Sequence, residues 1–269
     1  MTGIRGAVRS EWIKLWSVRS TWWCLAIAAG LMLGLSLLVA GVSPATSDDT
    51  GADTGGLDAA AVLSYATVGV GFGQLVFGVL GCLVVTGEYG TGMIRTTLLA
   101  SPWRARAMLA KGAVLAVVAL LVSALTLTAS TLVVVGVSQA RGITVDLDDG
   151  QLWRGLAGAC GYLALVGLLS TGIGLIVRVS AGAIATALGV LLVLPIVATL
   201  IAALTSAQWL ADAASFLPSD AGAQLYGYDY GVGTTTGVDL SWWAGGLVLA
   251  AWAVAAWIAG LLLVRRRDV

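Results

Sequence analysis

Apolar stretches of membrane length alternate with short polar segments along the whole chain. Six such stretches predict helices, at about residues 22–42, 61–85, 112–138, 153–177, 182–204 and 244–264. A helix needs roughly 20 predominantly apolar residues to cross the hydrocarbon core of a bilayer. No charged residue stands well inside any of the six stretches. The pattern therefore predicts an all-α, polytopic membrane protein in which residues 1–269 form a single transmembrane domain.

Composition agrees with this fold class and excludes several functions. The chain is 59% hydrophobic and only 10% charged, with a mean hydropathy of +0.96, whereas soluble domains carry roughly 25% charged residues. It contains no histidine, and its three cysteines are scattered through apolar stretches. We therefore expect no metal site, no cofactor and no histidine-based nucleophile. The net charge of zero gives no general attraction to nucleic acid.

The first 21 residues are basic and carry tryptophans. Ile4, Val8, Trp12 and Trp16 recur at every fourth position, which indicates one face of a helix lying in the membrane interface. A basic, mostly flexible tail is the alternative interpretation. A signal peptide is a competing interpretation of the apolar stretch that follows. This stretch is longer than the roughly 7–15 apolar residues of a signal peptide, so an uncleaved helix is favoured.

The charges sort to the two sides of the predicted membrane. With both termini in the cytoplasm, 12 of the 14 basic residues lie inside and 11 of the 14 acids lie outside. The inside set is Arg5, Arg9, Lys14, Arg19, Arg95, Arg104, Arg106, Lys111, Arg178, Arg265, Arg266 and Arg267. Because basic residues are retained on the cytoplasmic side, this arrangement predicts a multi-pass protein of the cytoplasmic membrane.

The segment Thr86–Lys111, between the second and third stretches, carries several basic residues. Within it, 91–99 predicts a short helix with an apolar stripe that includes Ile94 and Leu98. Ser101-Pro102 ends that helix, because the residue before proline is pushed out of the helical region. We interpret it as a docking helix for a cytoplasmic partner; a solvated connector is the alternative.

Three further features shape the predicted bundle. Gly69 and Gly73 form a small-xxx-small pair, which lets helix backbones approach closely in lipid. Pro195 interrupts the fifth stretch and is expected to kink it. The aromatic-rich segment 205–243 suits an interfacial or re-entrant element on the outer side.

The order of a basic start (SEWIKLWSVRSTWW), six helices and the segment TGEYGTGMIRTTLLASPWRARAMLAK resembles the membrane subunit of a type-2 ABC exporter, of the kind common in actinobacteria. The resemblance implies a connecting helix at the start, an outer re-entrant element at 206–240, and a coupling helix within Glu88–Pro102. It also implies a separate ATP-binding subunit and a pair of permeases, identical or different. The residues expected to contact the ATPase are Glu88, Tyr89, Ile94, Arg95, Leu98, Pro102 and Arg104.

The sequence also limits what could supply energy for transport. Neither of the two lysines ends a GxxxxGK[ST] loop, so the chain has no nucleotide site of that type and is not expected to be an enzyme by itself. The absence of mid-membrane charge disfavours an ion-coupled carrier and suits a hydrophobic or amphipathic substrate. Two other classes stay open, a membrane anchor or sensor for an ATPase and an intramembrane enzyme, although the second lacks a catalytic cluster.

Overall fold

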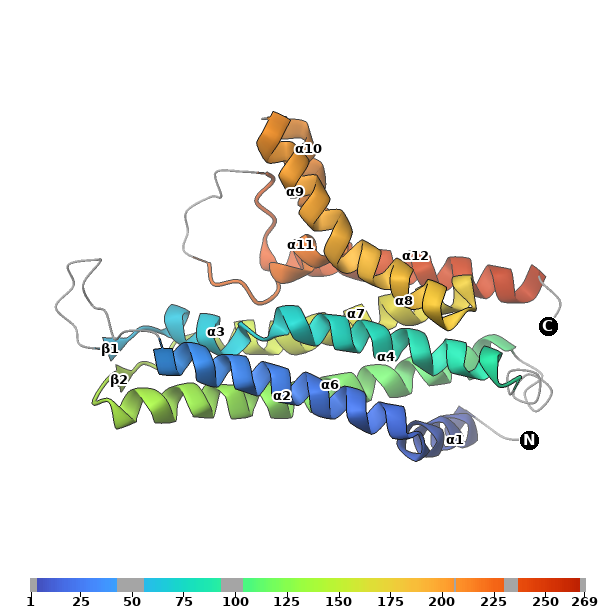
Figure 1. The fold of residues 1–269 in the computed structure, drawn as a ribbon, viewed down its shortest axis with the longest axis horizontal. Coiled ribbons are helices and arrows are strands. Elements are labelled where there is room, and N and C mark those ends of the chain that lie inside the picture. The colour runs from blue at the N-terminus through green and yellow to red at the C-terminus, as the bar shows by residue number, and fades with distance from the viewer. Residues whose placement is uncertain (1–3, 43–55, 93–103, 206, 230–236, 267–269) are drawn as a thin grey trace.

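The computed structural model describes residues 4–42, 56–92, 104–205, 207–229 and 237–266. Within these ranges six stretches of helix are long and apolar enough to cross a membrane, which confirms the predicted all-α fold (Figure 1). The helices are α1 (Ile4–Ser17), α2 (Arg19–Val42), α3 (Ala59–Thr67), α4 (Val70–Gly90), α6 (Arg104–Ala140), α7 (Gly150–Val177), α8 (Ser180–Leu188), α9 (Leu194–Thr205), α10 (Gln208–Ala214), α11 (Pro218–Ala223) and α12 (Trp242–Arg266). Two short strands, β1 (Gly56–Leu57) and β2 (Thr144–Val145), pair in parallel.

Helix α7 is the central element of the bundle and has the largest buried share of the six spans. It packs against α4, α6 and α12. Its contact with α4 depends on small residues, because a Cβ added at Gly81 would lie 2.4 Å from the carbonyl oxygen of Gly167. Close approach of this kind replaces the hydrophobic driving force that is absent between helices in lipid.

The second span is built from two helices, α3 and α4, which are separated at Val68–Gly69. Gly69 lies against α2: a Cβ there would be 2.4 Å from the Cα of Met32. A Cβ at Gly73 would be 2.9 Å from the sulfur of the same methionine. In the described residues, the two glycines of the small-xxx-small pair thus face another span of their own chain.

The fifth span contains a π-helical turn, Gly189–Val193, between α8 and α9. This turn stands directly before Pro195, whose ring removes one backbone donor and disturbs the helix. Beyond it, α9 leans away from the rest of the bundle, and α10 returns beside it (Figure 1). The short helix α11 then packs against the N-terminal part of α12 and against the π-helical turn.

The helices flanking the predicted cytoplasmic segment are longer than their apolar stretches. Helix α4 continues to Gly90 and α6 begins at Arg104. Thr91 and Gly92, which we expected to begin a new helix, instead form the turn that ends α4, with Gly92 at φ +70°. The rest of the predicted coupling helix, including Ile94, Arg95, Leu98 and Pro102, lies outside the described residues. The end of α4, the start of α6, α1 and the last turns of α12 are at the same end of the bundle (Figure 1).

Candidate functional site

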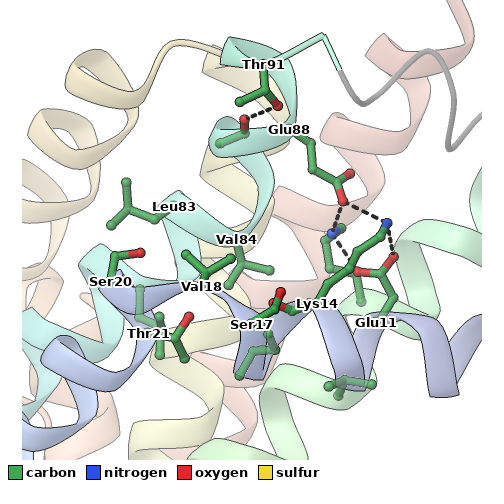
Figure 2. Close-up of a pocket in the computed structure, with 15 residues that line it drawn as sticks. Glu11, Lys14, Ser17, Val18, Ser20, Thr21, Leu83, Val84, Glu88 and Thr91 are labelled. Carbon is green, nitrogen blue, oxygen red and sulfur yellow. Dashed lines mark hydrogen bonds and ion pairs between the residues drawn. The ribbon is translucent and has the colours of Figure 1, made fainter.

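The two glutamates and two lysines of the chain all meet at one place. Glu11 and Lys14 come from α1, Glu88 from the last turn of α4, and Lys111 from α6 (Figure 2). The ammonium of Lys111 lies 2.7 Å from Glu11 Oε2 and 2.8 Å from Glu88 Oε1. The ammonium of Lys14 lies 2.9 Å from Glu11 Oε1 and 3.1 Å from Glu88 Oε1. We call these four residues the ion network.

The ion network is buried except at one corner. The side chain of Lys111 is 4% exposed, whereas that of Lys14 is 32% exposed. Burial acts to raise the pKa of Glu11, but the neighbouring Lys111 and Lys14 outweigh it, so the pKa lies below its ordinary value. The two carboxylates and two ammonium groups sum to zero charge, which is the condition under which ions are tolerated away from water.

Local sequence explains how α1 reaches this position. Glu11 and Lys14 are three residues apart and therefore share one face of the helix, next to the buried side chain of Leu15. The corner between α1 and α2 is closed by Trp22, whose Nε1 donates to the carbonyl of Trp16 at 3.1 Å and whose ring packs on that indole. This corner fixes α1 relative to the first span.

A cleft of about 360 Å³ opens beside the ion network, between the α1–α2 corner and α4. Figure 2 shows Val18 and Thr21 on one wall and Val84 on the other. The ion network forms one end of the cleft, and the remainder is lined by apolar side chains together with the hydroxyl residues Ser17, Ser20, Thr21 and Thr91. The cleft therefore has one charged end and a mainly apolar remainder. It lies near the ends of the apolar stretches of the first three spans.

A second contact ties α4 to the opposite side of the bundle. Arg178 ends α7 in the left-handed conformation, at φ 64°. Its guanidinium carbon lies 5.3 Å from the centre of the Tyr89 ring, and its Nη2 donates to the carbonyl of Leu263 on α12 at 3.1 Å. Together with the ion network, this contact connects the end of α4 to α1, α6, α7 and α12.

Of the predicted ATPase-contacting residues, the structure describes the side chains of Glu88 and Tyr89. Arg104 opens α6, but its side chain lies outside the described part of the chain, as do Ile94, Arg95, Leu98 and Pro102. Gly69 and Gly73 lie on the same span as Glu88 but face α2, away from the ion network.

Sequence reasoning missed three members of the network, Glu11, Lys14 and Lys111. The sequence pattern places Lys14 and Lys111 only among the basic residues of the cytoplasmic side. One signal was present: the only two glutamates and the only two lysines of the chain all fall near predicted helix ends on one side. A scan against protein-family models and a search of curated proteins gave no match. Function is therefore inferred from the residues of this chain.

Proposed function

We propose that this chain is the membrane-spanning permease subunit of an ATP-driven exporter. It would move a hydrophobic or amphipathic substrate across the cytoplasmic membrane, as one of a pair of permeases, using a separate ATP-binding subunit. Six candidate spans support a polytopic protein. In the described residues, the charged side chains of these spans lie near the helix ends, which favours an external energy source over ion coupling.

The ion network is the observation that carries the proposal. It joins α1 to α4 and α6, which are the two helices that flank residues 91–103. A partner that pushes on this segment would displace both helices and α1 together, because a buried ion pair strongly resists the separation of its members. A connector with no partner has no need of such a rigid base.

Replacing Ile94 and Leu98 with aspartate should uncouple the permease from its ATPase. The two apolar side chains are expected to bury in a groove on the ATPase, and a carboxylate there is desolvated without a counter-ion. The permease should still insert, but the co-purified ATPase and its hydrolysis in lipid vesicles should fall at least about tenfold, equivalent to about 1.4 kcal/mol of binding.

The matched control is Val238→Asp, which adds a charge at an exposed apolar position preceding α12. This variant should bind and stimulate the ATPase like the unmodified protein. If the Ile94/Leu98 variant does the same, the exporter proposal loses its coupling element. If coupled hydrolysis persists without movement of any amphipathic substrate, the chain is an anchor or sensor for the ATPase.

The proposed membrane topology can be tested by labelling single cysteines. In a background in which the three native cysteines are replaced by alanine, a cysteine at Ser47 or Thr235 should react with an impermeant thiol reagent added to intact cells. A cysteine at Thr97 should not react until the membrane is opened. The physical reason is the retention of basic segments on the cytoplasmic side. Labelling of position 97 in intact cells would reverse the proposed orientation.

A further inference from the structure

A second cavity, of about 550 Å³, lies between α9, α10 and α11. Five of its ten described lining residues are alanines, and the others are Thr199, Gln208, Ser215, Asp220 and Gly237. Ligand pockets in proteins commonly span roughly 300–1,000 Å³ and are mainly apolar, with a few polar groups that orient the ligand. This cavity has that size and that kind of wall.

Asp220 is the one charged residue in the described lining of this cavity. Its carboxylate accepts no hydrogen bond and forms no ion pair with any residue that the structure describes, and burial raises its pKa. Other aspartates of the chain are used differently. Asp58 accepts from the backbone N–H of Ala61, and Asp149 accepts from that of Gln151, so each caps a helix. Asp220 stands in the first turn of α11 without such a bond.

The backbone that carries Asp220 is fixed by packing. Pro218, Ser219, Ala221 and Gly222 of α11 are buried. A Cβ added at Gly222 would lie 2.5 Å from the ring of Tyr162, which shows how closely α11 meets α7. The helix therefore holds the carboxylate at the cavity wall before any ligand arrives, and such preorganisation reduces the entropy lost on binding.

The packing of α11 sets the surroundings of the carboxylate. Helix α11 contacts the π-helical turn of the fifth span, and Gly222 lies beside Leu249 of α12. The Asp220 side chain is half-buried, and a partly desolvated carboxylate is stabilised by a nearby opposite charge. The described lining contains no lysine or arginine, so a bound cation would supply that charge.

We propose that this cavity binds organic cations that have an apolar body, with Asp220 as their countercharge. A single carboxylate does not suit a calcium ion, which takes six to eight oxygen ligands. An anion would meet repulsion, and a neutral apolar molecule would leave the carboxylate unpaired. That such a cation is the cargo rests on the proposed export function, whereas its binding to this chain does not.

The experiment measures binding of tetraphenylphosphonium to the purified full chain in detergent micelles by equilibrium dialysis. Tetraphenylborate, an anion of nearly the same shape, is the second probe. The cation should bind more tightly than the anion. Asp220→Asn should weaken the cation at least about tenfold, because it removes one charge-assisted contact. Asp212→Asn, on α10 but outside the cavity lining, should leave binding unchanged.

Ala203→Trp provides an independent variant, because Ala203 lines the cavity and is exposed. The indole should fill the cavity and abolish cation binding while Asp220 is retained. Equal binding of the two probes would overturn the proposal, and so would unchanged cation binding by Asp220→Asn. Neither measurement includes an ATPase, so this proposal can fail while the exporter function stands, and the reverse is also true.

Discussion

Replacing Lys111 with methionine should lower the free energy of unfolding by about 3–5 kcal/mol, the loss typical when one partner of a buried ion pair is removed. The Lys111 side chain is 4% exposed and bridges two carboxylates on different helices. Without it, Glu11 and Glu88 face each other with only Lys14 to balance them. Equilibrium unfolding of the purified protein in mixed micelles, followed by tryptophan fluorescence, measures the change.

Lys14→Met is the matched control, since Lys14 contacts the same two carboxylates but its side chain is 32% exposed. We expect a loss of about 1 kcal/mol or less, because solvent screens exposed pairs. Adding Glu88→Gln to Lys111→Met should recover part of the larger loss, because the double variant leaves less unbalanced charge. Equal, small losses for both lysines would mean that the ion network does not hold α1 to the bundle.

Gly69→Leu should also destabilise the fold strongly, by up to about 3 kcal/mol, the upper part of the usual range for overpacking. A Cβ at this position would lie 2.4 Å from the Cα of Met32 and 3.0 Å from its carbonyl oxygen. These are backbone atoms, so no side-chain rotation relieves the clash, and α2 must move away from α4. The expected results are a lower melting temperature and a lower yield of folded protein in detergent.

Gly71→Leu, two residues further along the same span, tests whether the effect is steric. A Cβ at Gly71 meets no described atom within 4 Å, so this variant should melt within a few degrees of the unmodified protein. Gly69 stands in the turn before α4 at helical dihedral angles (φ −77°, ψ −11°) and Gly71 stands inside α4, so the same side chain is added at two positions of similar backbone conformation. If the two variants have the same melting temperature, contact with Met32 does not determine the position of the second span.

The six spans could be predicted from sequence because each is recorded locally, as an apolar stretch of sufficient length. The break in the second span could not. Val68 and Gly69 stand within a continuous apolar run, and the contact that Gly69 makes with Met32 of α2 joins residues far apart in sequence. Helices α4 and α6 also extend beyond the predicted stretches and include Glu88 and Lys111, which pair with each other in space. In the sequence, where this pairing is not visible, each of the two charges indicates the end of a span.

The candidate site also depends on contacts between distant residues, which the local sequence pattern does not record. Glu88 stands in the central segment, but its partners Lys14 and Lys111 lie 74 and 23 residues away in sequence. The sequence places Arg178 only among the basic residues of the cytoplasmic side, and its contact with the Tyr89 ring depends on how α7 packs against α4. Asp220 was one acid of a long outer segment. Its place at the wall of a cavity depends on how α9, α10 and α11 come together in space.

The gathering of both lysines in the ion network has a consequence for protein chemistry. Reagents that acylate primary amines need an accessible nitrogen, and the Lys111 side chain is only 4% exposed, with its Nζ between two carboxylates. Apart from its amino terminus, the folded chain should thus resist such reagents at every position but Lys14. Acylation of Lys111 then requires α1 to separate from α4 and α6. The rate of acylation of Lys111 therefore measures the opening of that end of the bundle.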